Sequence, residues 1–151
     1  MKNPPKPQAF VVTPQNYADP LNVLGIRITV LASNTATQGY EITLQQGDEG
    51  AGPPPHSHDW DESFYVLKGK VEIRCEDQTV ACAPGTLVHV PAGTVHGYRF
   101  SAGGGELFEI SGQGGFATRM FTKVSRALPP GPPDIAQLVG LLRQNGVTLA
   151  A

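Results

Sequence analysis

The sequence predicts an all-β fold, a sandwich or closed barrel of antiparallel strands, followed by one C-terminal helix. Runs rich in β-branched and aromatic residues are short, and turn signals separate them roughly every 8 to 12 residues. The 151 residues include 18 Gly and 14 Pro, which favours many turns over long helices. A chain of this length forms one domain and buries about two-thirds of its unfolded surface.

The first part of the chain is expected to form an arm and then a barrel of six to eight strands. Residues 1–21 form a Pro-rich N-terminal arm whose apolar patch, Phe10-Val11-Val12, could add an edge strand, including to a neighbouring subunit. The barrel domain covers residues 22–124, with its motif core at 50–100. Its strands are expected at residues 23–31, 40–45, 63–67, 71–75, 79–83, 86–90, 95–100 and 106–110.

The end of the chain has a different character. A helical turn is expected near 116–124, and residues 125–151 form a Pro-rich linker and a C-terminal helix. Asp134 can cap the N-terminus of that helix, and Asn145-Gly146 can end it near residue 144. Its apolar stripe consists of Ile135, Leu138, Val139, Leu141 and Leu142. Such a stripe packs against the barrel or a dimer partner, with a regulatory lid as the alternative.

Charge and composition exclude several classes of partner. The net charge is −2, and Lys and Arg form no cluster, which argues against binding to nucleic acid. No stretch approaches the ~20 apolar residues of a membrane span. The first residues carry no apolar signal-peptide region, so we expect a cytoplasmic protein with no membrane partner.

The two cysteines, Cys75 and Cys82, flank an expected two-residue turn at Asp77-Gln78. In that register Cys75 faces Val80 and Cys82 faces Ile73. The thiols are then diagonal neighbours with poor disulfide geometry, so we expect two free, buried thiols.

Residues 50–100 contain histidines and a glutamate, side chains that commonly bind metal ions, at spacings that let them converge on one ion. His56 and His58 project from the same face of a strand because they are two residues apart, and Glu62 follows after a short bend. His96 supplies a third imidazole. Neutral imidazoles and one carboxylate suit a single divalent transition metal ion: Fe, Mn, Ni, Cu or Zn. A hydrogen-bonded polar cluster without metal is the alternative, but it would leave Glu62 buried without a cation.

The spacing around these residues resembles the two sequence motifs of the cupin superfamily. The first, G-x5-H-x-H-x3-E-x6-G, is matched at Gly50, His56, His58, Glu62 and Gly69. The second, G-x5-P-x-G-x2-H-x3-N, is matched at Gly85, Pro91, Gly93 and His96, and Phe100 stands in place of Asn. The chain is therefore similar, over roughly residues 40 to 112, to small bacterial single-domain cupins, including quercetin-dioxygenase-like ones. The resemblance implies an antiparallel jelly-roll β-barrel, and the missing Asn, which is not a ligand in the family, concerns only the turn after His96.

Tyr98 is the residue that we predict to assist catalysis. It lies two residues from His96 and so shares its face, where its hydroxyl could act as a general acid or orient a substrate. By parity, Phe100 should line the same apolar pocket. Phe64 and Val66 could line it too, but for these two we expect the plain barrel core.

Other polar residues are weaker candidates. His89 is out of phase with Val88 and Val90 and should face the other side of the sheet. Asp59 and Asp61 should be solvated, with contact to a ligand histidine as the alternative. Arg27 and Gln45 could reach the cavity from other strands.

Several functions are compatible with these residues. The resemblance implies a metal-dependent dioxygenase that uses O2 on a small enolisable or polyhydroxy-aromatic molecule. The alternatives are a non-redox cupin enzyme, such as an isomerase, decarboxylase or lyase, and a small-molecule binding or sensor module without turnover. We also expect a homodimer, because the arm and the apolar stripe at 135–142 offer interface material.

Overall fold

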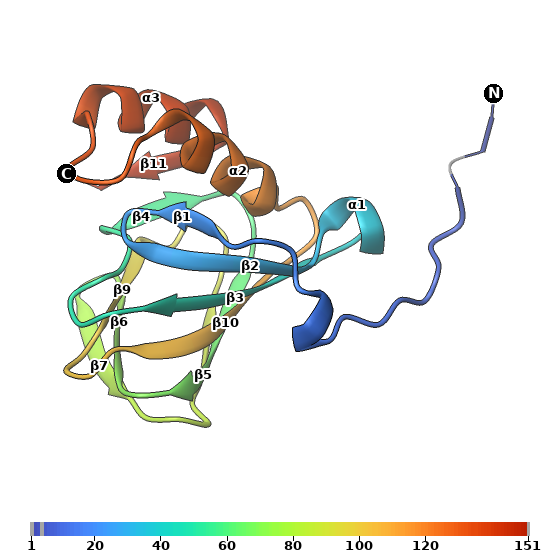
Figure 1. Cartoon of the computed structure of the whole chain (residues 1–151). Helices are drawn as coiled ribbons and strands as arrows, with labels where there is room; N and C mark the ends of the chain where they lie inside the picture. The colour runs from blue at the N-terminus through green and yellow to red at the C-terminus, as the bar shows by residue number, and fades with distance from the viewer. Residues whose placement is uncertain (1, 4, 151) are drawn as a thin grey trace.

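The computed structural model describes residues 2–3 and 5–150, which form two antiparallel β-sheets packed face to face with two longer helices across one end (Figure 1). Those residues contain eleven strands, a short 3-10 turn and three α-helices. In chain order the elements are η1 (Pro14–Asn16), β1 (Leu21–Val23), β2 (Ile26–Ala32), α1 (Asn34–Thr37), β3 (Glu41–Gly47), β4 (His56–His58), β5 (Glu62–Lys68), β6 (Val71–Cys75), β7 (Gln78–Cys82), β8 (Leu87–Val90), β9 (His96–Phe100), β10 (Gly105–Ser111), α2 (Ala117–Ala127), α3 (Ile135–Gln144) and β11 (Val147–Leu149).

The two sheets enclose the core. The first has the strand order β1-β2-β3-β10-β5-β8, and the second has the order β11-β4-β9-β6-β7. Burial alternates along the strands, so that Phe64 and Val66 of β5 and Val71 and Ile73 of β6 point inward. This arrangement confirms the predicted all-β jelly-roll barrel. Residues 5–13 form an extended segment outside the two sheets (Figure 1), where the Gln38 side chain donates to the Pro5 carbonyl at 2.8 Å. Pairing of this segment with a neighbouring subunit stays a prediction.

The number of strands exceeds the predicted six to eight. The expected strand 23–31 is interrupted by a tight turn, because Leu24 (φ 52°) and Gly25 (φ 82°) both adopt the left-handed conformation that joins β1 to β2. The three-residue β11 was not predicted. It pairs with β4, placing Val147 opposite His58 and Leu149 opposite His56.

The β6–β7 hairpin corrects the predicted register. Cys75 pairs with Gln78, so the turn lies at Glu76-Asp77, and Glu76 takes the left-handed conformation with φ 54°. Cys82 therefore faces Val71 and not Ile73. Both thiols are free, as predicted, but only Cys82 is buried, because Cys75 at the end of β6 is half-buried.

The C-terminal helices cover one end of the barrel (Figure 1). α2 is longer than the predicted helical turn at 116–124, and it packs on β1 and α3. α3 matches its predicted bounds, since the Asp134 side chain accepts a hydrogen bond from the Gln137 N–H at 3.1 Å. Leu138 and Leu142 of its apolar stripe are buried against the same chain, whereas Ile135 is 62% exposed. Most of the stripe is therefore occupied within the chain, and the homodimer stays a prediction.

Within the described residues, none of the helices is both long and apolar enough to cross a membrane.

Candidate metal centre

The structure brings the four predicted ligand residues together at the end of the barrel that the helices cover. His56 and His58 come from β4, Glu62 begins β5, and His96 begins β9 directly opposite His56. One ligand atom from each of the four lies within 4.8 Å of the others. The cluster of three imidazoles and one carboxylate has the composition of a site that could bind a metal ion.

Two motif glycines tie the ligand-bearing strands together. Gly50 (φ 83°) donates its N–H to the Phe100 carbonyl at 2.8 Å, and Gly93 (φ 83°) donates its N–H to the His58 carbonyl at 2.8 Å. Both positions need a left-handed backbone, which glycine adopts without strain. Phe100, which replaces the motif Asn, continues β9 as a buried strand residue.

Each ligand imidazole is oriented by a backbone carbonyl. The Nδ1 atoms lie close to carbonyl oxygens: His56 to Pro54 at 2.8 Å, His58 to Trp60 at 3.0 Å and His96 to Thr94 at 2.8 Å. A carbonyl oxygen only accepts hydrogen bonds, so each Nδ1 carries the proton. In the neutral imidazoles, each Nε2 then presents a lone pair.

The inner atoms of the cluster fit a cation. The Glu62 Oε2 atom lies 3.1 Å from His58 Nε2 and 2.6 Å from His96 Nε2. Two atoms that each lie about 2.0–2.2 Å from one metal ion are roughly 2.8–3.6 Å apart, so the His58 separation fits a shared ion directly, whereas the His96 separation is that of a hydrogen bond and must widen slightly when an ion binds. Lone pairs of buried acceptors converge here, and they repel one another unless a metal ion or protons lie between them. The donor set therefore fits a divalent transition metal.

The ionisation of the cluster reflects its burial and crowding. Burial and the neighbouring His96 lower the pKa of His56 to about 4. Burial acts to raise the pKa of Glu62, but hydrogen bonds from His58 and His96 outweigh it and hold that pKa below its usual range. The pKa of His96 is raised because the hydrogen bond to Glu62 outweighs burial. Without a metal ion, a proton shared by His96 and Glu62 takes the place of the cation.

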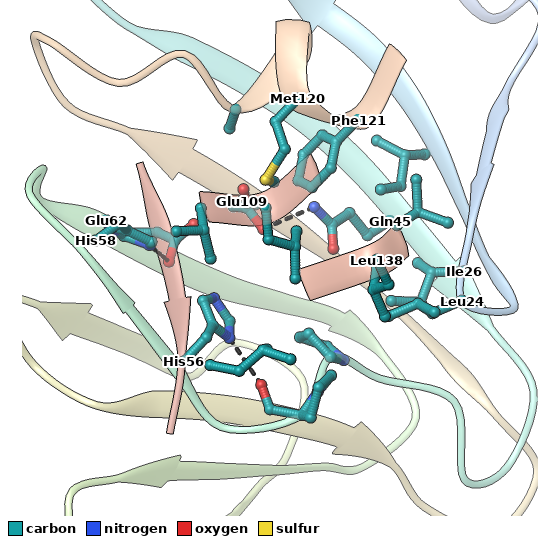
Figure 2. Close-up of a pocket in the computed structure, with 18 of the residues that line it drawn as sticks. Leu24, Ile26, Gln45, His56, His58, Glu62, Glu109, Met120, Phe121 and Leu138 are labelled. Carbon is teal, nitrogen blue, oxygen red and sulfur yellow. Dashed lines mark hydrogen bonds and ion pairs between the residues drawn. The ribbon is translucent and has the colours of Figure 1, made fainter. Parts of the chain in front are cut away.

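A small apolar cavity of about 60 Å³ adjoins the cluster (Figure 2). Its apolar walls come from the β1–β2 region and from the C-terminal α2, α3 and β11. The C-terminal contribution consists of Ala117, Met120, Phe121, Leu138, Leu142, Val147 and Leu149. Benzene is held by an apolar cavity of about 150 Å³, so this cavity admits only smaller molecules while the helices stay in place.

Two polar residues outside the cluster also line this cavity, Gln45 of β3 and Glu109 of β10. The Gln45 Nε2 group donates to Glu109 Oε2 at 2.7 Å and to Thr43 Oγ1 at 3.1 Å. Burial and the nearby Glu62 raise the pKa of Glu109 well above its ordinary value. The sequence prediction ranked Gln45 low and missed Glu109, although Glu109 has the same parity as the buried Leu107.

Tyr98 lies near this pair but does not line the cavity. It is buried, and its hydroxyl donates a hydrogen bond to Gln45 Oε1. Burial, with Glu109 and Glu62 close by, raises its pKa well above 10. The hydroxyl therefore keeps its proton and reaches the cavity only through Gln45.

The other candidates lie where the sequence placed them, except Arg27, which was expected to be able to reach the cavity but is exposed and does not line it. His89 is exposed, and its Nδ1 lies 2.9 Å from Ser63 Oγ. Asp59 and Arg27 are exposed, and the exposed Asp61 accepts the Ala92 N–H at 2.9 Å. Phe64, for which the sequence favoured the plain barrel core, lines the cavity.

One contact of a ligand was not predicted from the sequence. The Trp60 ring stacks on the His58 imidazole, with 4.0 Å between ring centroids and 7° between planes. Trp60 also supplies the carbonyl that orients His58.

Comparison with known proteins agrees with this geometry. Residues 40–107 match the family described as Cupin domain. A quercetin 2,3-dioxygenase of Bacillus subtilis (strain 168) is 34% identical over 77 residues, which cover 50% of this chain but only 23% of that protein.

Two solved structures share the fold. An RmlC-like cupin from Shewanella frigidimarina NCIMB 400 has a TM-score of 0.66 at 16% identity, covering 74% of this chain and 96% of that one. The polyketide cyclase RemF from Streptomyces resistomycificus has a TM-score of 0.60 at 20% identity, covering 70% and 80%. At such identities the likeness is one of fold.

Proposed function

The chain belongs to the cupin superfamily, and on that basis we propose that it is a metal-dependent dioxygenase-type enzyme acting with O2 on a small enolisable molecule. His56, His58, Glu62 and His96 hold one divalent transition metal ion. The observation that carries this proposal is the convergence of their inward-facing donor atoms beside an apolar cavity. A metal that prefers five or six ligands keeps one or two positions for small molecules.

The residues around the ion have distinct tasks. A redox-active metal in this site supplies Lewis-acid polarisation and electron transfer with O2, and both oxygen atoms enter the organic product, so no external reductant is needed. The backbone carbonyls fix the imidazoles, and the apolar walls exclude water from the reacting molecule. Tyr98 orients Gln45 and through it the substrate.

The size of the cavity bears on the substrate. The cavity has a volume of about 60 Å³, and the volume of a small enolisable compound is closer to this value than that of a polyhydroxy-aromatic compound is. The similarity to a quercetin 2,3-dioxygenase supports dioxygenase chemistry, but it extends over about a quarter of that protein. An aromatic substrate would need α2, α3 or β11 to move away from the cavity.

Oxygen uptake by protein of known metal content tests the proposal. Samples loaded separately with Fe, Mn, Ni, Cu and Zn are offered a panel of small diketones and flavonols. We expect uptake of one O2 per product molecule with at least one redox-active metal, its loss in Glu62→Gln and its retention in His89→Ala. The absence of O2 uptake in every metal-loaded sample would contradict the proposal.

A non-redox enzyme, such as an isomerase or lyase, is the second candidate. Glu109 favours it, because this carboxyl is outside the ligand set and faces the same cavity, where it could transfer a proton. Product formation without O2 consumption, including with Zn, would identify it. A ligand-induced rise in melting temperature without any product would instead indicate a binding module.

A further inference from the structure

Gln45 and Glu109 form a polar surface on the cavity wall beside the candidate metal centre. Among the described residues that line the cavity, they are the polar side chains outside the four-residue cluster, apart from Trp60, whose indole Nε1 is buried without a hydrogen-bond partner. The other walls are apolar apart from backbone atoms. A polar group of a bound molecule that does not reach the metal therefore has this pair as its partner, or the Trp60 N–H where that group only accepts a hydrogen bond.

The strand register places Glu109 next to the cluster. On the antiparallel β10–β5 pair, Ser111 is opposite Glu62 and Glu109 is opposite Phe64. Glu109 is thus the diagonal neighbour of Glu62 on the inward face, at a Cα separation of about 7–8 Å. Side chains of this length meet over that distance. In Figure 2, Glu109 lies between Glu62 and Gln45.

Hydrogen bonds fix the orientation of this pair. Both hydrogens of the Gln45 amide are used, since Nε2 donates to Glu109 Oε2 at 2.7 Å and to Thr43 Oγ1 at 3.1 Å. Gln45 Oε1 accepts from Tyr98. The Glu109 carboxyl is therefore held in one position, as a group that selects a ligand must be.

We propose that Glu109, positioned by Gln45, is a specificity-determining residue that selects small molecules with oxygen functions on two adjacent carbons, such as an α-hydroxy ketone or its enediol. One oxygen binds at the metal and the other hydrogen-bonds to Glu109. This inference rests on the proposed metal centre, but it does not require turnover or O2.

The selectivity follows from the cost of an unpaired buried polar group. The Glu109 carboxyl already accepts a hydrogen bond from Gln45, and a ligand with one oxygen, bound at the metal, leaves the remaining hydrogen-bonding capacity of that carboxyl without a partner from the ligand. A ligand with two oxygens satisfies both groups. A hydrogen bond of this kind contributes roughly 1–1.5 kcal/mol, which corresponds to a preference of about fivefold to tenfold.

Binding to the Co²⁺-loaded protein without O2 tests this assignment. Hydroxyacetone and acetone form the probe pair, because they differ by one hydroxyl group, and the visible spectrum of Co²⁺ reports each titration. Four proteins are compared: wild type, Glu109→Leu, Glu109→Gln and Glu106→Gln. Glu106 is the matched control, since it lies on the same strand but points outward to Gln46 and Lys68.

We expect wild type and Glu106→Gln to bind hydroxyacetone about fivefold to tenfold more tightly than acetone. Glu109→Leu should bind the two about equally, and Glu109→Gln should keep part of the preference, because an amide still forms hydrogen bonds. If Glu109→Leu does not fold, Glu109→Gln decides: a reduced preference supports the assignment and an unchanged one overturns it.

Equal affinities in the wild type, or a full preference in folded Glu109→Leu with normal Co²⁺ content, would overturn the assignment. Failure of the metal centre itself is recognised separately, because wild-type protein would then take up no Co²⁺ before any probe is added.

Discussion

At the scale of single residues, the candidate centre depends on the tautomers of its three histidines. Because each Nδ1 donates to a backbone carbonyl, the metal-binding capacity resides in the Nε2 atoms, and those of His58 and His96 contact the same Glu62 oxygen. Local spacing allowed the sequence to predict this quartet. Glu109 was missed because its position beside Glu62, 47 residues earlier in the sequence, depends on the register between β10 and β5.

Removal of a proposed ligand should abolish metal binding, whereas removal of His89 should not. His96→Ala should lower metal affinity at least about tenfold, because only water could replace the imidazole. His89→Ala deletes an exposed imidazole on β8 and should leave metal content unchanged. Elemental analysis of the purified proteins measures both. The assignment is wrong if His89→Ala loses metal while His96→Ala retains it.

Acidification should release the metal, because His96 takes up a proton at a higher pH than His56 does. A neutral imidazole is needed for coordination, and protons compete once the pH falls through the raised pKa of His96, above 6.5. His56, with its pKa of about 4, stays neutral until the pH is much lower. NMR titration of the metal-free protein should therefore show His96 protonating before His56, and metal affinity should begin to decline while the pH is still above 6.5. The opposite order of protonation would contradict this expectation.

Tyr98→Phe should distinguish an orienting role from proton transfer. The hydroxyl contacts Gln45 and not the cavity, so its loss should leave metal content unchanged and lower kcat/KM by about tenfold or less. Loss of a general acid would instead cost about 10²–10⁴ in kcat and remove one limb of the pH profile. Steady-state kinetics over pH 5 to 9 on the substrate identified by O2 uptake separates the two roles.

At the scale of elements, the C-terminal segment completes the cavity of the barrel. The strands and α3 were predictable from periodicity, turn residues and the Asp134 cap. β11 was not, since Val-Thr-Leu is too short a pattern to be recognised and its partner β4 lies about 90 residues earlier. The sequence therefore left open whether the apolar stripe of α3 packs on the barrel or on a dimer partner, and Leu138 and Leu142 line the cavity of their own chain.

Truncation of Leu138 should destabilise the protein and enlarge the cavity. This side chain is 3% exposed, so Leu138→Ala should lower the free energy of unfolding by about 2–4 kcal/mol. Ile135→Ala is the control on the same helix, and its 62% exposure limits the expected loss to about 0.5 kcal/mol. Urea denaturation monitored by circular dichroism measures both. Equal effects of the two substitutions would show that α3 does not pack on the barrel in solution.

At the scale of the whole molecule, the candidate metal centre joins parts of the chain that few other contacts connect. β4 meets β9 in register at the pair His56–His96, and β11 covers its other edge. A metal ion bound by β4, β5 and β9 would therefore link both sheets, because Glu62 belongs to the first sheet and the histidines to the second. The burial of Glu62 between imidazoles makes the cluster costly without a cation or a proton.

Metal removal should accordingly destabilise the entire fold. A ligand at 100 times its dissociation constant stabilises the native state by about 2.7 kcal/mol, which for a chain of this size corresponds to a melting temperature roughly 5–10 °C higher. Treatment with a chelator should lower the melting temperature by that amount, and re-addition of the metal should restore it. Glu62→Gln is the control, because it removes the only formal negative charge among the four proposed ligands and should make the melting temperature nearly independent of metal. A confirmed metal-free sample that melts at the same temperature as the loaded protein would mean that the cluster is stabilised by protons and does not function as a metal centre.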